Sequence, residues 1–598
     1  ILFFFGVGNH GGGPTLRFLQ VIEELKPKLP FLELKYSSLY DFYKKIIRQK
    51  QKIPIFKGEL QYTCRGCYTS LIKIKFLNRY AENKLQTAEI LSSISYKILN
   101  KEYPSLKIEK NWRKILFCQF HDIIAGTSIP KAYEDCLGLI ESSIVFSKKL
   151  INENLWSISN VISTDNIEGF PVLFFNPTSF EREEVKRISF VQRYGYDFII
   201  PKEIEFFDAN NKEIYSQSIE EPNTGRKEYL VKVKIPPYGF NVYWWRPSTQ
   251  QKKNYNLILK DNIIENQKLL VGIDKEKSGF RVILKEKNID LFKEYGGIFL
   301  VIEDYSNAWG HGYSSFRDVI GKFDILELYN GENGNCMVSI FYKLVYNNSE
   351  IHQEVILYDG LPYIEVKGKI FWTEKNKFLK ISFPLNLNNC KIYAEIPYGY
   401  IERPSDGNEN PCQRWVEIIG MKEDEKVGVG FINCGWYGYD FFENELRISA
   451  LRSPVYASLK DPQKLEKNKF YDFQSYGINE FKYWILPHLG EINSSNVVKY
   501  AYFLNNEIEY ILPLRKKGYY SPPFSFINVS PENIVLSCIK KEENGDNIIF
   551  RLYEAYGEKT DAKIEIFGRK FMIKFDKFEI KTLKFFKKIK KLKEVDLN

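Results

Sequence analysis

The spacing of apolar residues changes once along this chain, and the change limits the folds that the chain can adopt. Before about residue 160, apolar residues recur every three or four positions, as they do on one face of an α-helix. From about Gly169 onward they alternate with polar residues, as in residues 231–235, which is typical of half-buried β-strands. The sequence therefore predicts a helical part followed by a longer part made of strands.

Three helices are predicted in the helical part, from apolar stripes over residues 74–91, 112–124 and 133–151. Each stripe covers only one side of its helix, so the helices bury their apolar sides best against one another, and we expect a three-helix bundle. Beyond them, turn signals such as Asn176-Pro177 separate the predicted strands, which favours antiparallel β-sandwiches.

A glycine-rich loop near the start of the chain follows a predicted strand. Residues 1–5 form a short apolar run typical of a buried strand, and residues 6–15 contain the glycines. Residues 16–28 then show a helical pattern, and a second strand-like run covers residues 31–36. This order of strand, loop and helix predicts an α/β arrangement at the start of the chain.

The same loop leaves a dinucleotide-binding site open as an alternative. Gly6, Gly8 and Gly11 fit the G-x-G-x-x-G pattern, and a glutamate lies roughly 20 residues onward. Against this alternative, Asn9 and His10 place polar groups in a loop that should contact a pyrophosphate closely. No further strand–helix units follow the loop, which also weakens the alternative.

One short segment stands out for its chemistry. His121 and Asp122 stand side by side, and the chain has only five histidines. Gly126 and Pro130 read as a helix stop and a fresh start, which predicts that the pair lies in the last turn of the second helix. Successive helical residues point about 100° apart, so one site can use both only near a helix end. The pair is therefore either a metal-capable or ligand-binding pair, or a histidine that caps the C-terminus of its own helix.

Together with further motifs, the glycine loop and the His-Asp segment resemble glycoside hydrolase family 38, the zinc-dependent α-mannosidases. The likeness runs the length of the chain. The further motifs are residues 57–61, 65–70, 395–399, 401–407, 411–416, 437–440, 451–454 and 486–488. Several long motifs in the right order form a more specific signal than any single one.

The resemblance implies a multidomain fold of α/β, α and β parts. We expect the C-terminal end of a βα-barrel catalytic domain at residues 1–60 and a central three-helix bundle at 61–160. A small β-sandwich at 161–250, a large β-sandwich at 251–500 and a terminal β domain at 501–598 should follow. Because a βα-barrel takes about 250 residues, the chain is expected to be the C-terminal portion of a longer enzyme.

The resemblance also implies a chemistry, the retaining hydrolysis of terminal α-D-mannosyl residues with one zinc ion as cofactor. Of the zinc ligands, only His121 is expected in this chain, and the nucleophilic aspartate is expected outside it, so the isolated chain should be inactive. Asp122, His10, Asn9 and Tyr439 are the expected substrate contacts. The identity of the general acid stays open, because Asn9 cannot donate a proton in acid catalysis.

Composition bears on the remaining classes of function. The net charge of +10 comes from 85 basic residues opposed by 75 acidic ones, and the lysines near the C-terminus alternate with apolar residues, so we do not expect nucleic-acid binding. No run of 18 apolar residues is present, so no membrane span is expected. Nine cysteines without a framework spacing, including the lone pair Cys64 and Cys67, favour reduced thiols and a cytoplasmic location.

The alternative function is a non-catalytic carbohydrate-binding or scaffold protein whose β-sandwiches recognise glycans. Under either reading the expected partner is a mannose-containing oligosaccharide or glycan, and a homo-oligomer stays open. Trp309 and His311 resemble part of a family motif, but we expect them to serve packing. His352 and His488 lie in strand-like runs and are expected to be structural.

Overall fold

The computed structural model describes residues 2–7, 12–49, 53–56, 60, 63–190, 203–248 and 256–595. The chain forms two compact units, Ile1–Tyr62 and Thr63–Asn598. In the described residues, a helical region precedes many antiparallel sheets, so the protein is a mixed α and β multidomain protein, as the change in apolar spacing predicts. None of the described helices is both long enough and apolar enough to cross a membrane.

The first unit contains two capped helices. α1 (Leu16–Leu25) begins after Thr15, whose Oγ1 accepts a hydrogen bond from the N–H of Phe18 at 3.3 Å, and continues into the 3-10 turn η1 (Lys26–Lys28). α2 (Leu39–Arg48) begins after Ser38, which caps it in the same way. Such caps satisfy N–H groups that have no partner within the helix. The helical pattern over residues 16–28 is thereby confirmed.

The two strands predicted in this unit are wrong for its described residues. Their one β pairing is a bridge between Val7 and Gly12, and residues 31–36 form no strand. Phe3 and Phe4 are 79% and 81% exposed. A buried strand needs neighbouring strands for its N–H and C=O groups, and the described part of this unit supplies none. The assignment of residues 1–60 to a barrel domain stays a prediction.

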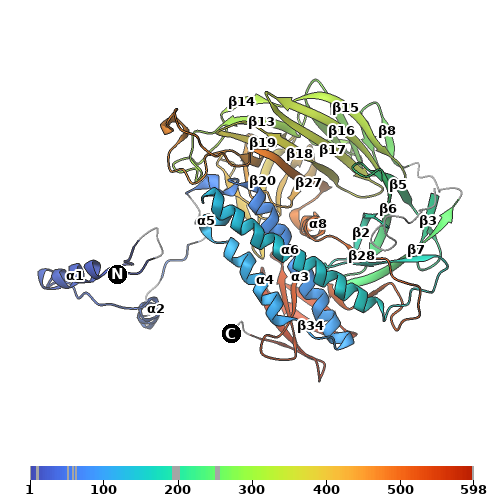
Figure 1. Ribbon diagram of the computed structural model, residues 1–598, viewed down its shortest axis with the longest axis horizontal. Coiled ribbons are helices and arrows are strands. Elements are labelled where there is room, and N and C mark those ends of the chain that lie inside the picture. Colours follow the sequence, from blue (N-terminus) through green and yellow to red (C-terminus); the bar gives the residue numbers. More distant parts are fainter. Residues whose placement is uncertain are drawn as a thin grey trace. The chain divides into compact units, whose positions relative to one another are not determined.

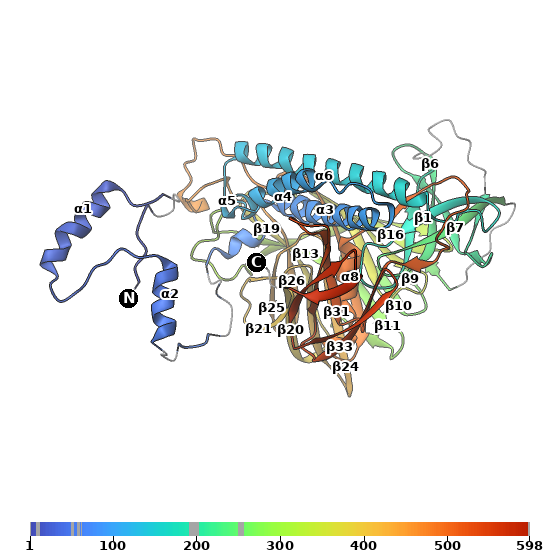
Figure 2. The same ribbon diagram turned by 90° about the horizontal axis from the view of Figure 1, so that it is seen from below.

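Three long helices begin the second unit and lie side by side (Figure 1; Figure 2). They are α3 (Ile72–Leu99), α4 (Ser105–Cys118) and α6 (Pro130–Ser159). Leu85 of α3, Ile115 of α4 and Ile140 of α6 belong to one buried cluster, and each is 0% exposed. The three helices predicted from the apolar stripes are therefore present. They bury much of each stripe against one another, but Leu116 and Phe120 of the second stripe stay 56% and 53% exposed.

Two sheets directly follow the helices in sequence. Their strand orders are β28-β1-β7-β3-β4, with β29 also paired to β7, and β2-β6-β5. The strands are β1 (Phe170–Phe175), β2 (Arg182–Ile188), β3 (Glu203–Phe207), β4 (Glu213–Ile214), β5 (Ser216–Glu221), β6 (Arg226–Ile235), β7 (Gly239–Ser248), β28 (Glu509–Ile511) and β29 (Phe524–Ser525). The sheet that β1 belongs to is thus completed by strands from beyond residue 500.

The largest β region contains sheets of the orders β12-β11-β10-β9-β8, β14-β13-β19-β26-β25-β22 and β15-β16-β17-β18-β27-β24-β23-β20-β21. The last of these is called the nine-stranded sheet below. The strands are β8 (Ile258–Lys260), β9 (Ile263–Glu265), β10 (Leu269–Asp274), β11 (Gly279–Leu284), β12 (Ile289–Asp290), β13 (Ile298–Glu303), β14 (Val319–Lys322), β15 (Asp324–Asn333), β16 (Met337–Tyr346), β17 (Ser349–Tyr358), β18 (Ile364–Trp372), β19 (Lys377–Pro384), β20 (Asn388–Ile396), β21 (Gly399–Arg403), β22 (Asn410–Pro411), β23 (Trp415–Lys422), β24 (Glu425–Asn433), β25 (Gly438–Phe442), β26 (Glu445–Arg452) and β27 (Gly477–Leu489).

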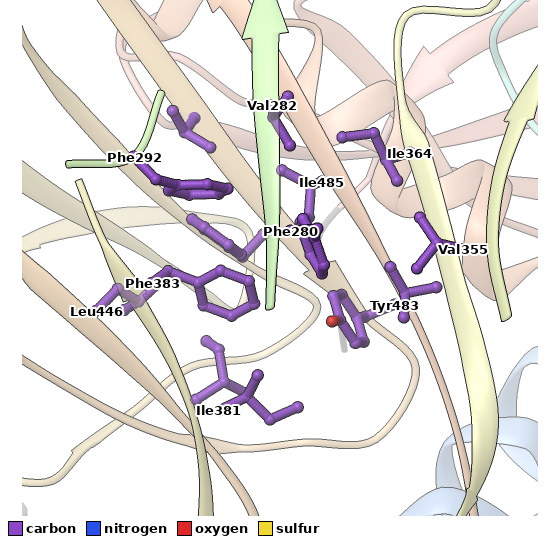
Figure 3. Packing of buried hydrophobic residues seen from close by; sticks show 14 of the residues in the cluster. Phe280, Val282, Phe292, Val355, Ile364, Ile381, Phe383, Leu446, Tyr483 and Ile485 are labelled. Atoms are coloured by element: carbon purple, nitrogen blue, oxygen red, sulfur yellow. The ribbon is translucent and has the colours of Figure 1, made fainter. Parts of the chain in front are cut away.

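These three sheets meet in one apolar core. Figure 3 shows Phe280 of β11, Phe383 of β19 and Tyr483 of β27 converging there, and each comes from a different sheet. The ring of Phe383 lies 6.4 Å from that of Phe280 and 6.2 Å from that of Tyr483, measured between centroids. Inward-facing alternate residues of the three sheets thus account for the period of two in the sequence.

The last part of the chain forms two small sheets, β30-β33-β34 and β31-β32-β35-β36. Their strands are β30 (Ile527–Ser530), β31 (Ile534–Lys541), β32 (Ile548–Glu554), β33 (Thr560–Ile566), β34 (Arg569–Phe575), β35 (Ile580–Phe586) and β36 (Lys591–Glu594), and they follow α8 (Val497–Asn505). The described residues of the second unit also include three short 3-10 turns, η2 (Arg65–Tyr68), η3 (Pro462–Lys464) and η4 (Ile492–Ser494). Phe550 shares a buried cluster with Ile94 of α3 and Leu155 of α6, so the terminal strands pack on the helices. The domain boundaries expected from the sequence stay predictions.

Candidate functional site

His121 and Asp122 belong to a separate short helix, so their placement in the last turn of the preceding helix is wrong. α4 ends at Cys118, and Phe120 has φ −53° and ψ 141°, an extended conformation that interrupts the helix. α5 (His121–Ile124) begins directly after it. The apolar spacing does not reveal this break, because Ile115 of α4 and Ile123 of α5 still point into the same buried cluster.

The short helix presents both side chains to solvent. The side chain of His121 is 79% exposed and that of Asp122 is 50% exposed, with 3.6 Å between Nε2 of the histidine and Oδ2 of the aspartate. The ring of Phe120 lies 4.2 Å from the imidazole, between centroids. The alternative interpretation requires His121 to cap the C-terminus of its own helix. His121 is instead the first residue of α5, so it caps neither α4 nor the C-terminus of α5. The arrangement is an open imidazole–carboxylate pair beside an aromatic ring.

Tyr133 of α6 forms hydrogen bonds with the backbone of the short helix that carries this pair. Its hydroxyl donates toward the carbonyl oxygens of Asp122 and Ile123, each at 3.2 Å, and accepts a hydrogen bond from the N–H of Ser128 at 3.0 Å. Tyr133 is buried, so these bonds are shielded from water. The sequence pattern identifies Tyr133 only as an apolar-stripe residue, and its polar role depends on the fold.

Lys75 of α3 holds the end of α5 from a second direction. Its Nζ donates to the carbonyl oxygen of Ile124 at 2.8 Å and to that of Ser70 at 2.5 Å. Burial lowers the pKa of Lys75 to about 7, although the nearby Cys67 thiol opposes this shift. A neutral amine still has two N–H donors, which match these two carbonyl oxygens. No sequence pattern singles out Lys75, because lysines on helices are mostly exposed.

Gly126 is held from a third direction and fits only as glycine. Gln474 donates from Nε2 to the carbonyl oxygen of Gly126 at 2.6 Å. The φ of Gly126 is +81°, and a Cβ atom there would lie 2.4 Å from the carbonyl oxygen of Ser70. α6 then begins at Pro130, so the predicted helix stop and fresh start are confirmed. The turn that carries His121 is therefore fixed by contacts from α3, α6 and the segment before β27.

Tyr439 lies in a different environment from the exposed pair. It pairs with Asn410 of β22 and Ile448 of β26 and is 1% exposed. Burial raises the pKa of its hydroxyl far above the usual range, and within the described residues that hydroxyl has no hydrogen-bond partner. The structure thus shows Tyr439 as a packed side chain. A contact between Tyr439 and substrate stays a prediction.

A buried charge network lies beside Tyr439. The ammonium group of Lys380 is 2.5 Å from carboxylate oxygens of both Glu409 and Asp440, and all three side chains are 0% exposed. Arg317 also contacts Asp440. Buried charges that are mutually paired in this way are stable only while the network is complete. The network therefore fixes β19, the segment before β22 and β25 relative to one another.

The remaining expected site residues, Asn9 and His10, lie outside the described residues. Where the structure describes the chain, no three His, Cys, Asp or Glu side chains gather closely enough to hold a metal ion. Zinc sites take three or four protein ligands, and His121 with Asp122 supplies at most two. The described residues thus do not form a zinc site by themselves.

The lone C-x-x-C pair shows no sign of metal binding either. The thiol of Cys67 faces the carbonyl oxygen of Trp309 at 3.8 Å, and burial raises the pKa of Cys67 to about 11. A metal ligand must be a thiolate, which a raised pKa disfavours. All nine cysteines fall within the described residues, and all are free thiols.

Three family models match the second unit. "Alpha mannosidase middle domain" matches residues 63–158, "Glycosyl hydrolases family 38 C-terminal domain" matches residues 264–463, and "Glycosyl hydrolases family 38 C-terminal beta sandwich domain" matches residues 533–598. Together they cover more than half of the chain. The chain belongs to glycoside hydrolase family 38 and carries the middle and C-terminal domains of that family, as the sequence motifs imply.

Curated relatives match almost the whole chain. Alpha-mannosidase G of Dictyostelium discoideum is 27% identical, with 94% of this chain and 53% of the relative covered. Alpha-mannosidase 2C1 of Homo sapiens is 24% identical, with 94% of this chain and 51% of the relative covered. The chain thus spans about half the length of these curated relatives.

A solved structure shares the fold. The crystal structure of an alpha-mannosidase from Enterococcus faecalis V583 aligns with a TM-score of 0.80 at 16% identity, and the alignment covers 95% of this chain and 74% of that chain.

Proposed function

We propose that this chain is part of an α-mannosidase that removes terminal α-D-mannosyl residues from oligosaccharides or glycans by a zinc-dependent retaining mechanism. The observation that carries the proposal is the order of the three matching segments, middle domain, C-terminal domain and C-terminal β-sandwich, along one chain. The curated relatives that match over 94% of the chain are named α-mannosidases, which supports the same activity.

Within this proposal, His121 supplies one ligand to the zinc ion and Asp122 contacts mannose hydroxyls. Three features support these roles: both side chains are exposed, the turn beneath them is held by Lys75, Tyr133 and Gln474, and a neutral imidazole is a common zinc ligand. A carboxylate accepts hydrogen bonds from hydroxyl groups in up to four directions, which suits a sugar. The other zinc ligands, the nucleophile and the general acid are proposed to lie outside the described residues.

The proposal includes a cellular location and a partner. Nine free thiols support a reducing compartment, so we expect the protein to be cytoplasmic. The expected partner is a mannose-containing oligosaccharide or glycan. The glycosidic linkage that the enzyme prefers depends on parts of the active site that the described residues do not form.

Zinc content and turnover test the proposal. The purified 598-residue chain should retain little zinc and should not hydrolyse an aryl α-mannoside. The protein translated from the complete reading frame should bind zinc and hydrolyse the aryl α-mannoside. His121→Ala in that protein should remove the zinc. His311→Ala, which replaces another exposed histidine, is the matched control and should leave the zinc in place.

Asp122→Asn separates sugar binding from metal binding. The variant should keep zinc and lower kcat/KM about 10- to 100-fold, since a charged hydrogen bond to substrate is lost. Asp135→Asn on α6, an exposed carboxylate paired with Lys131, should leave kcat/KM unchanged. Full zinc occupancy in His121→Ala, or unchanged kcat/KM in Asp122→Asn, would contradict the assigned roles.

A further inference from the structure

Two adjoining cavities lie between α3 and the nine-stranded sheet. Their volumes are about 820 Å³ and 450 Å³. Five residues line both cavities, so the two are parts of one groove, which is called the sheet groove below. The shared residues are Phe76, Cys434, Ile478, Glu480 and Lys482. Each volume falls in the range typical of sites for small organic ligands, about 300–1,000 Å³.

The floor of the sheet groove is the outer face of four neighbouring strands, β16, β17, β18 and β27. Successive residues of a strand point to opposite faces, so the neighbours of core residues such as Tyr342 and Val366 face the groove. The strand register places Phe341 opposite Glu354, Glu354 opposite Lys367, and Lys367 opposite Lys482. A row of groove-facing side chains therefore crosses all four strands.

The charges of this floor are paired with one another. Within the floor, ion pairs of 3.0 Å join Lys367 to Glu354 and Lys369 to Glu480, and Lys482 pairs at 3.0 Å with Glu365, which is buried beside the floor. Paired charges give no net field that would attract an ion. They do present carboxylate acceptors and ammonium donors next to each other, and a hydroxyl group can donate and accept at the same time. The rest of the lining is mostly apolar, so the floor suits a neutral ligand that has both apolar faces and hydroxyl groups.

Exposed aromatic rings stand beside these pairs. Phe341 and Phe371 both line the groove and are 36% and 45% exposed. Large exposed rings grouped on one surface commonly mark a binding site. A flat ring offers an apolar surface that matches the C–H face of a pyranose, while the ion pairs match the hydroxyl groups at its edge.

We infer that the sheet groove is a binding site for a neutral oligosaccharide, separate from the His121–Asp122 pair. The groove extends along two adjoining cavities, which favours several linked sugar units over a monosaccharide. The inference goes beyond the proposed function, because it requires no turnover and no metal ion. It assigns to the β-sandwich a role in holding a glycan.

Two other classes of ligand fit the groove less well. An extended peptide that adds to a sheet needs a free edge, and all four floor strands are paired on both sides. A fatty acyl chain would remove water from the ion pairs Lys367–Glu354 and Lys369–Glu480 without replacing its hydrogen bonds, which is unfavourable. An oligosaccharide replaces those hydrogen bonds with its own hydroxyl groups.

Isothermal titration calorimetry on the purified 598-residue chain tests the inference with α-linked mannotriose, cellotriose, mannose and oleate. At least one trisaccharide should bind saturably, and at least tenfold more tightly than mannose. Phe371→Ala should weaken that binding at least tenfold. Phe470→Ala removes a fully exposed ring that does not line the groove, and it should bind as the original chain does. Thermal unfolding of both variants by circular dichroism checks that they remain folded.

Three outcomes would overturn the inference. They are no saturable binding of either trisaccharide, unchanged binding in Phe371→Ala, and binding of oleate alone. The double variant His121→Ala/Asp122→Ala locates the signal, because it should bind the trisaccharide normally. A loss of binding in that variant would assign the signal to α5 and reject the groove. None of these results depends on the zinc and turnover measurements that test the proposed function.

Discussion

Replacing Gly126 with alanine should be among the most destabilising single-methyl changes in this protein. Gly126 follows α5 and has a φ of +81°, in the left-handed region. An L-residue there costs roughly 1–2 kcal/mol more than glycine. This part of the effect comes from the backbone alone.

The new methyl group would add a steric term. Its Cβ would lie 2.4 Å from the carbonyl oxygen of Ser70, whereas ordinary contacts begin at 3.4 Å. Ser70 cannot retreat easily, because its hydroxyl donates to the carbonyl oxygen of Ala308 at 2.7 Å and accepts from Arg452 at 3.0 Å. Overpacking of this kind costs about 1–3 kcal/mol. The two terms together predict a loss of about 2–5 kcal/mol.

Urea unfolding followed by far-UV circular dichroism measures this loss. Gly138→Ala is the matched control, since Gly138 lies on the exposed face of α6 and its Cβ would meet no atom within 4 Å. Alanine favours a helix interior over glycine by roughly 0.5–1 kcal/mol, so the control should be slightly more stable than the original chain. The same chemical change is thus expected to have opposite signs at the two positions.

A change of less than about 1 kcal/mol in Gly126→Ala would refute the reasoning, because it would mean that the turn after α5 moves freely. In that case the contacts from Lys75, Tyr133 and Gln474 would not fix the position of His121. A loss of about 2–5 kcal/mol in the free energy of unfolding of Gly126→Ala, with Gly138→Ala the more stable of the two variants, would support the reasoning.

Three further predictions concern buried polar groups. Lys75 has its pKa lowered by burial to about 7, so the unfolded chain binds more protons between about pH 7 and 10.5, and stability should rise across that window by a few kcal/mol. Lys75→Met should show no such rise in urea titrations at several pH values. Burial alone would lower the pKa of His488, but the charge and hydrogen bond of Glu417 outweigh it and raise the pKa. The stability from this pair is therefore present below pH 6.5 and is lost as the pH rises through the folded pKa, and Glu417→Gln should abolish the dependence. Tyr133→Phe should cost about 1–3 kcal/mol in the same unfolding assay, and a cost near zero would show that its hydroxyl does not hold α5.

Local sequence patterns predict those structural features that depend only on residues close together in the sequence. The three long helices, the restart at Pro130 and the period of two after Gly169 all follow from spacing within a few turns. Gly126 is recognisable as a helix stop for the same reason, since one backbone angle determines it.

Contacts between distant parts of the chain could not be predicted. Gln474 reaches Gly126 across 348 positions, and Lys75 reaches Ile124 across 49. The break at Phe120 is hidden because the apolar spacing continues across it. The strand predicted over residues 1–5 failed because a buried strand is defined by its neighbours, which the apolar pattern of those residues does not contain.

The position of β28 has a consequence for the synthesis of this protein. β1 pairs with β7 on one side and with β28 on the other, and Phe175 lies opposite Glu509, so β1 keeps an open edge until the ribosome has passed residue 509. Translation proceeds at about 5–20 residues per second, so the time between the synthesis of β7 and that of residue 509 is on the order of tens of seconds. During this time the edge of β1 can pair with other chains, so expression of any C-terminal truncation before residue 509 should favour aggregation.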